Sequence, residues 1–176
     1  MPGYPLCRKA VWASAASVCL LACACMGSTL PGPAGPSTDV PIELALPTIT
    51  GPPLDVAALR GQVLLIDVMA TWSLDSQAQV PLFSKLLAAY RERGLRVVSV
   101  AFDSQTPQLV RTWVDTLGVS WPVGLASPEV IEGRSPLGVI PEIPRTLILD
   151  RKGYVRFAHS GAVPAALLAK EIEALL

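Results

Sequence analysis

Strand-like and helix-like patterns alternate along residues 42–176, and this alternation limits the chain to a small set of folds. Short apolar runs rich in β-branched residues predict strands, and apolar positions that recur every three or four residues predict helices. Strands are predicted at 42–46, 63–69, 95–102, 121–125, 146–149 and 154–158, and helices at 77–93, 105–117 and 165–176. This order predicts one α/β domain, a mixed central sheet with helices on both faces.

Glycine and proline mark several ends of the predicted elements. Gly94 and Gly118 follow the first two helices, and Pro164 begins the last one. The turn at 150–153 predicts an antiparallel hairpin between the last two strands. Pro81 lies inside the first predicted helix, where the missing N–H predicts a kink.

The cysteines are confined to the start of the chain. All four, Cys7, Cys19, Cys23 and Cys25, lie in the first 25 residues. The remaining chain therefore has no disulfide framework, no cysteine zinc site and no cysteine nucleophile. His159 is the only histidine, and no cluster of ligands accompanies it. We expect no metal and no cofactor.

The charges balance in number. The sequence holds 14 basic and 14 acidic side chains and has a pI near 6.6. This balance predicts no basic surface for nucleic acid and no polybasic patch for lipid.

The N-terminal residues predict export. Arg8 and Lys9 precede an uncharged run over 10–22, which is typical of a signal peptide at 1–22. Residues 20–23 (LLAC) resemble the bacterial lipobox, which implies acylation of Cys23 and a lipid anchor in the membrane. Ordinary signal cleavage near Ala22 or Ala24 is the alternative.

Residues 23–41 predict a tether between that anchor and the domain at 42–176. Proline, glycine and small polar residues dominate this segment, and apolar periodicity is nearly absent. The protein is therefore expected in the bacterial cell envelope. Ala24 after the acylated cysteine indicates the outer membrane, with the domain facing the periplasm.

Four landmarks in the domain carry a resemblance to a known family. They are 70–72 (ATW), 73–76 (SLDS), Pro81, and 143–146 (IPRT). With them the region 42–176 resembles the thioredoxin superfamily, in particular the TlpA/ResA-type membrane-tethered thiol-disulfide proteins. The resemblance implies a thioredoxin-like three-layer sandwich. It also places Ser73 and Ser76 at the two cysteine positions of the redox CxxC motif.

Serine at those positions removes the chemistry that the resemblance implies. Disulfide exchange needs a thiolate to attack a disulfide sulfur, and a serine hydroxyl is scarcely ionised at neutral pH. Ser73 is instead expected to act as a helix N-cap. Asp67 matches the buried acid that assists the second cysteine in thioredoxins. Here it is either a hydrogen-bonded relic or a desolvated carboxyl with a raised pKa.

The resemblance also implies a peptide-binding groove. Pro144 matches the family's cis-proline, beside which an extended polypeptide can pair with the backbone. Trp72 and Ile143 are the other expected groove residues, and Trp113 is expected in the core instead. Two alternatives stay open: Pro144 only shapes its loop, or Pro141 takes the cis-proline role.

Three functions remain in competition. The first is a non-catalytic binding or scaffold module for polypeptides of the envelope. The second is a thiol-disulfide oxidoreductase that uses a thiol from outside the motif, for which Cys25 is the remaining candidate. The third is an assembly factor of an envelope complex that does not use the groove.

Overall fold

A five-stranded mixed sheet forms the centre of the computed structural model, which describes residues 38–176. The predicted signal peptide, Cys23 and the predicted tether up to residue 37 lie outside the described residues. Strand β3 pairs in parallel with β4 and antiparallel with β6. The strands lie in the order β5 (Val123–Leu125), β4 (Leu95–Ala101), β3 (Val63–Met69), β6 (Arg145–Leu149) and β7 (Val155–Ser160).

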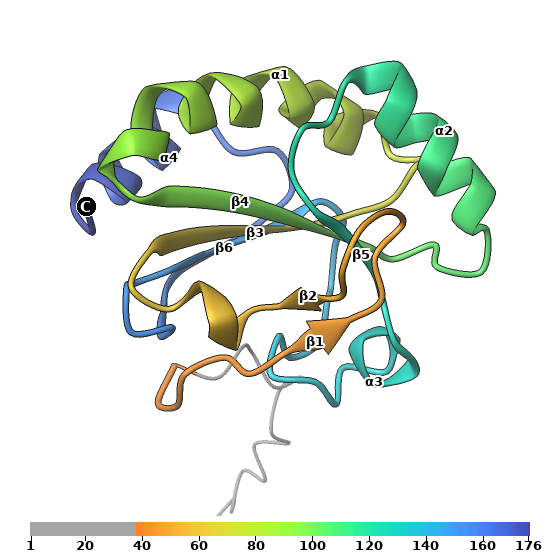
Figure 1. The fold of residues 1–176 in the computed structure, drawn as a ribbon, viewed down its shortest axis with the longest axis horizontal. Helices are drawn as coiled ribbons and strands as arrows, with labels where there is room; N and C mark the ends of the chain where they lie inside the picture. The colour runs from red at the N-terminus through yellow and green to blue at the C-terminus, as the bar shows by residue number, and fades with distance from the viewer. Residues whose placement is uncertain (1–37) are drawn as a thin grey trace, which may run out of the picture. The chain divides into compact units, whose positions relative to one another are not determined.

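Two outer layers cover this sheet, as expected (Figure 1). One layer consists of three helices, α1 (Leu74–Tyr90), α2 (Pro107–Leu117) and α4 (Ala165–Glu173). The other layer consists of the strand pair β1 (Ala45–Leu46) and β2 (Leu54–Asp55), the 3-10 helix η1 (Ala57–Leu59) and the short helix α3 (Pro128–Ile131). The mixed sheet between two outer layers confirms the predicted α/β class.

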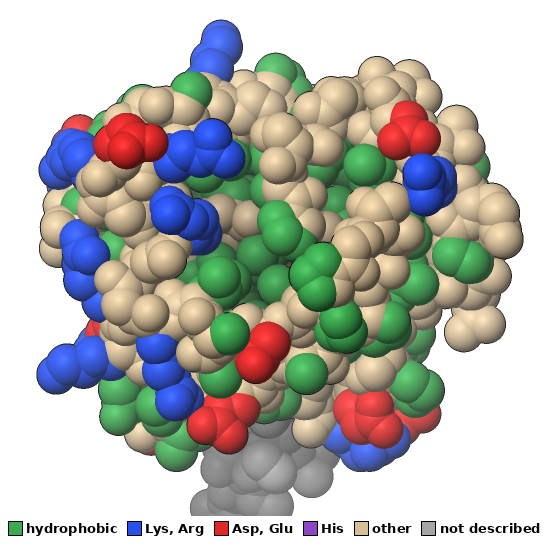
Figure 2. Space-filling model, viewed as in Figure 1, with side chains coloured by type: hydrophobic (Ala, Val, Ile, Leu, Met, Phe, Trp, Pro, Cys, Tyr) green, Lys and Arg blue, Asp and Glu red, His purple; other side chains and the backbone are tan. Residues whose placement is uncertain are grey.

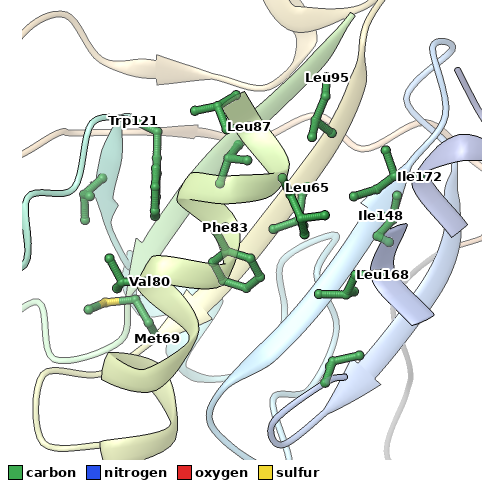
Figure 3. Packing of buried hydrophobic residues seen from close by; sticks show 14 of the residues in the cluster. Leu65, Met69, Val80, Phe83, Leu87, Leu95, Trp121, Ile148, Leu168 and Ile172 are labelled. Atoms are coloured by element: carbon green, nitrogen blue, oxygen red, sulfur yellow. The ribbon is translucent and has the colours of Figure 1, made fainter. Parts of the chain in front are cut away.

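The two faces of β3 explain the two halves of the core. Side chains alternate along a strand, so Leu65 points to the helical layer and Ile66 to the other layer. Phe83 of α1 is fully buried in the helical half, as Figure 3 shows, and its ring meets that of Trp121 edge-on at 6.3 Å. All seven residues of β3 are buried, which fits its central position.

Several predicted boundaries are wrong by a few residues. Helix α1 begins at Leu74 rather than 77, because Ser73 supplies the cap, and it ends at Tyr90 with the 3-10 turn η2 (Arg91–Arg93) after it. Strand β5 begins at Val123 rather than 121, since Pro122 has no N–H to pair. The first predicted strand shortens to Ala45–Leu46, and β2 and α3 are too short to leave a periodic pattern.

The described helices are all too short or too polar to cross a bilayer. This finding concerns residues 38–176 alone.

Truncation of Phe83 should destabilise the domain strongly. The Phe83→Ala substitution removes a fully buried ring, and we expect the free energy of unfolding to fall by about 3–5 kcal/mol. Urea unfolding followed by circular dichroism measures this change. The control is Leu74→Ala on the same helix, where the side chain is 78% exposed and the expected change is within about 0.5 kcal/mol. Equal losses in the two variants would contradict the packing described.

Candidate functional site

The turn that joins β3 to α1 is closed by serine hydroxyls. Ser73 is the N-cap of α1, and its Oγ accepts a hydrogen bond from the Ser76 backbone N–H at 3.2 Å. The Ser76 side chain is fully buried, and its Oγ accepts from the Ala70 N–H at 3.5 Å. The N-cap predicted for Ser73 is confirmed. Both hydroxyls therefore satisfy backbone donors that a helix start would otherwise leave without partners.

A carboxylate from the neighbouring strand holds the same turn in place. Asp103 follows the end of β4, and its Oδ2 accepts from the Thr71 backbone N–H at 3.1 Å and also from the Thr71 hydroxyl. Gln77 Nε2 donates to the Thr71 carbonyl at 3.0 Å. Sequence reasoning missed Asp103. The available signal was its position, since the C-terminal ends of parallel strands β3 and β4 meet at one edge of the sheet.

Two large apolar side chains project into solvent on either side of the cap. Trp72 is 68% exposed and Leu74 is 78% exposed, while Ser73 between them is buried. Trp113, by contrast, lies in the core as predicted. An exposed tryptophan beside an exposed leucine is an apolar surface of the kind that binds partners.

The loop before β6 reaches the same edge of the sheet. Val68 of β3 pairs with Arg145 of β6, so Pro144 and Ile143 lie beside the end of β3 where the turn begins. The Ile143–Pro144 peptide bond is cis. The Pro144 carbonyl accepts from Gly161 N at 2.8 Å, whereas the Ile143 backbone N–H and C=O have no partner within residues 38–176.

Asp67 lies in the middle of β3 and is buried. The Ser99 hydroxyl donates to its Oδ2 at 3.2 Å, and the Trp121 indole N–H donates to that hydroxyl at 2.8 Å. Its Oδ1 is buried without a partner. Burial raises the pKa of Asp67 from 3.8 to about 7, although the Ser99 hydrogen bond opposes the rise. The Asp67 carboxyl is thus hydrogen-bonded and desolvated at once.

Polar side chains continue from Asp67 across the sheet. Thr146 of β6 is the cross-strand partner of Asp67, and His159 of β7 is the partner of Thr146. The Thr146 hydroxyl is buried without a partner, and His159 Nε2 lies 2.8 Å from Glu171 Oε2 of α4. The single histidine therefore joins β7 to α4.

Two other kinds of site could serve a function within residues 38–176, a metal centre and a cavity. Within residues 38–176 no three His, Cys, Asp or Glu side chains converge as metal ligands. A cavity of about 510 Å³ lies away from the turn, between residues 49–55 and the segment that joins α2 to β5. Its walls are mainly apolar, and its single carboxylate, Asp55, already accepts from the Ala57 N–H at 2.9 Å.

With this geometry defined, comparisons with known proteins identify the family. Residues 38–158 match the profile of the AhpC/TSA family. The chain belongs to the AhpC/TSA family. It is 29% identical over 119 residues to the thiol:disulfide interchange protein DsbE of Tatumella citrea. This match covers 68% of the present chain and 60% of the Tatumella protein. It is 22% identical over 134 residues to the thiol-disulfide oxidoreductase ResA of Halalkalibacterium halodurans, which covers 75% of this chain and 73% of that protein.

Solved structures confirm the thioredoxin-like fold. A crystal structure of a thiol:disulfide interchange protein of the thioredoxin family from Chlorobium tepidum superposes with a TM-score of 0.67. The two sequences are 24% identical, and the match covers 81% of this chain and 97% of that one. The resemblance inferred from the sequence therefore identified the correct family and fold. The chain itself carries no cysteine beyond residue 25, and residues 73 and 76 are serine.

The buried carboxyl should make the stability of the domain depend on pH. Because the pKa of Asp67 is about 7 in the folded state and 3.8 ordinarily, the folded protein retains a proton that the unfolded chain releases. The contribution of Asp67 to the free energy of unfolding is therefore fully present below about pH 4 and is lost as the pH rises to about 7. The free energy of unfolding should fall by about 4 kcal/mol over this range. Urea unfolding at about pH 4, 5, 6 and 7 measures this decrease.

Two variants separate this effect from other titrating groups. Asp67→Asn cannot ionise, so its free energy of unfolding should lack this decrease between about pH 4 and pH 7. Asp75→Asn, the same substitution at an exposed site in the first turn of α1, should retain it. A decrease of equal size in Asp67→Asn and the wild type would show that Asp67 is not its source.

Proposed function

We propose that this domain is a non-catalytic member of its family that binds extended polypeptides at the surface formed by the side chains of Trp72 and Leu74 and the backbone of Ile143, beside the buried cis-proline Pro144. The observation that carries the proposal is the pair of exposed apolar side chains around Ser73, at a turn that has no thiol. In relatives named as thiol-disulfide oxidoreductases, such a surface would present a substrate to a thiol. Here it presents a polypeptide to a hydroxyl that is already used as a helix cap.

The chemistry of serine supports binding without turnover. A hydroxyl at neutral pH supplies almost no oxyanion, and an Oγ–Sγ bond does not form a productive mixed intermediate in disulfide exchange. The hydroxyl oxygens of Ser73 and Ser76 accept hydrogen bonds from backbone N–H groups, and neither hydroxyl is hydrogen-bonded to a histidine or a carboxylate within residues 38–176. Asp67, which would assist a thiol, has no thiol in the domain to deprotonate.

The backbone of Ile143 supplies the second element of recognition. An extended peptide adds to an exposed edge through main-chain hydrogen bonds, and its alternate side chains enter apolar contacts. The N–H and C=O of Ile143 would provide the main-chain hydrogen bonds, and Trp72 and Leu74 would provide the apolar contacts. Recognition of this kind is sequence-tolerant, which suits a partner that is unfolded or has a flexible segment.

The predicted signal peptide and the predicted acylation of Cys23 support a location in the bacterial envelope. We propose that the domain is held at the outer membrane and faces the periplasm, where its partner is an envelope polypeptide. An oxidoreductase that relies on Cys25 would need the tether to bring that thiol to the turn. An assembly factor would not use the Trp72 surface. Mutation of this surface therefore distinguishes an assembly factor, whose partners would be unchanged, from a polypeptide-binding module, which would lose its partners.

The absence of turnover can be tested by restoring the thiols. Protein with serine at both positions should leave the rate at which dithiothreitol reduces insulin unchanged, whereas the Ser73→Cys/Ser76→Cys double variant should accelerate it, because the helix N-terminus stabilises a thiolate. Insulin precipitation measures turnover, with Cys25→Ser present in every protein compared. The single variant Ser73→Cys is the control, since it lacks a resolving thiol. Wild-type turnover would refute the proposal, and a folded but inert double variant would refute the motif alignment.

Binding can be tested with a polypeptide that has no free thiol. Fluorescently labelled α-lactalbumin, reduced and carboxymethylated, serves as the probe, and fluorescence anisotropy gives the dissociation constant. Trp72→Ala should weaken binding about 30-fold, the loss typical of an aromatic hot spot. Leu109→Ala is the control, because Leu109 is an exposed apolar residue of α2 (52%) that is not part of the proposed surface. Equal affinities for all three proteins would contradict the proposed surface.

A further inference from the structure

Six cationic side chains gather at the end of the sheet opposite the Ser73 turn. They come from the segment after η1, from η2 and the start of β4, and from the turn between β6 and β7. Figure 2 shows blue side chains concentrated on the left of the molecule, where these segments lie. We call this surface the basic face, and it comprises Arg60, Arg91, Arg93, Arg96, Arg151 and Lys152.

Hydrogen bonds to backbone carbonyls join these segments. Arg151 donates through Nη1 to the Gly61 carbonyl at 3.0 Å and through Nη2 to the Arg93 carbonyl at 3.2 Å. Arg96 Nη1 donates to the Arg91 carbonyl at 3.1 Å. Carbonyl oxygens orient the guanidinium groups but do not neutralise them.

Carboxylates compensate little of this charge. Arg60 pairs with Glu43 at 3.0 Å, and Arg151 Nη2 donates to the main-chain oxygen of Leu176, the last residue of the sequence, at 2.6 Å. Apart from Glu43, no Asp or Glu carboxylate lies within 4.0 Å of these six cations among residues 38–176. Glu92 lies in the same turn, and Asp150 nearby already pairs with Arg156 at 2.6 Å. The zero net charge predicted no polybasic patch for lipid, but composition does not record where the fold places each charge.

The other end of the sheet has the opposite character. Asp75, Asp103 and Glu142 lie around the Ser73 turn and the loop before Pro144, where the cation Arg145 is buried. The seven residues of β3 separate the two ends by roughly 23 Å. This distance exceeds two Debye lengths of about 8 Å at physiological salt, so each end presents its own potential to a partner.

The N-terminal part of the chain joins the domain at the basic face. Ile42 N donates to the Gly153 carbonyl at 2.8 Å, and Gly153 follows Lys152 directly. The Pro41 side chain packs so close that a Cβ on Gly153 would lie 3.4 Å from it. Whatever residues 1–40 attach to therefore connects to the domain beside these cations.

From the charge, its lack of carboxylate partners and the point of chain entry, we infer that the basic face docks on a surface of anionic phospholipid headgroups. Guanidinium groups match phosphate oxygens in geometry, and cations near an anionic leaflet each strengthen attachment. Docked in this way, the domain turns Trp72 and the Ser73 turn away from the bilayer and toward polypeptides in the aqueous phase.

Vesicle flotation of the full chain tests this inference. The measured quantity is the partition onto vesicles with about 30% phosphatidylglycerol divided by that onto pure phosphatidylcholine vesicles, at about 20 mM and about 500 mM salt. The N-terminal residues are the same in every protein compared, so differences between variants report the domain. We expect the wild-type ratio to exceed one at low salt and to approach one at high salt.

Two double variants of equal charge make the test specific. Arg91→Gln/Lys152→Gln removes two exposed side chains of the basic face that make no hydrogen bond or ion pair within the described residues. Each cation removed should lower the partition ratio about fivefold, so the double variant should lower it about 25-fold. Arg111→Gln/Arg134→Gln removes two cations that lie outside the face and pair with Asp115 and Glu132. This control should keep the wild-type ratio within about twofold.

The remaining outcomes overturn the inference. Equal losses in the two double variants would mean that net charge alone governs attachment. A wild-type ratio of one at low salt would mean that anionic lipid is not recognised. Displacement by soluble glycerol phosphate beyond that caused by sodium chloride at matched ionic strength would indicate a discrete phosphate pocket rather than a membrane surface.

Discussion

Burial of β3 on both faces is the constraint on which the rest of this structure depends. The strand lies third in the sheet, pairs on both edges, and packs against the helical layer with one face and against the β1–β2 layer with the other. Its C-terminal end leads through the capped turn into α1. Its N-terminal end is hydrogen-bonded to the residue after η2, and the residues before it are hydrogen-bonded to the turn between β6 and β7. One strand thus fixes the position of the candidate site and of the basic face at opposite ends of the domain.

At the serine turn the family fold is kept with hydroxyls at both ends of the 73–76 motif. A cysteine and a serine differ little in shape, yet the thiolate carries the exchange reaction, and the hydroxyl serves as a hydrogen-bond acceptor. Ser73 and Ser76 fill that second role with backbone donors of their own turn. Trp72 and Leu74 remain exposed around them, so the proposed binding surface does not depend on sulfur chemistry.

Burial of the Asp67 carboxyl costs free energy of solvation, and the hydrogen bond from Ser99 only partly offsets this cost. One oxygen accepts from Ser99 and the other has no partner, so the neutral form is favoured and the pKa rises to about 7. Apolar substitution would remove the cost and also the polar row that continues through Thr146. The carboxyl therefore links the stability of the centre of the sheet to the pH around the protein.

Much of the fold follows from local pattern, because apolar periodicity and turn residues act over neighbouring positions. Strand β3 matches its predicted limits, and the alternation of strands and helices predicts the mixed sheet. The Ser73 cap is also local, since donor and acceptor are three residues apart. The short elements β2 and α3 escaped prediction, since two to four residues carry no periodic signal.

The sequence alone determined that the domain contains no thiol and that a thioredoxin-like order of elements surrounds the two serines. Tertiary structure alone decided which distant residues meet. Asp103 reaches Thr71 across 32 positions, and Arg151 reaches Gly61 across 90. Strand pairing and helix packing create such contacts only when the chain is folded. For the same reason a chain of zero net charge acquires a basic face at one end and an acidic rim at the other.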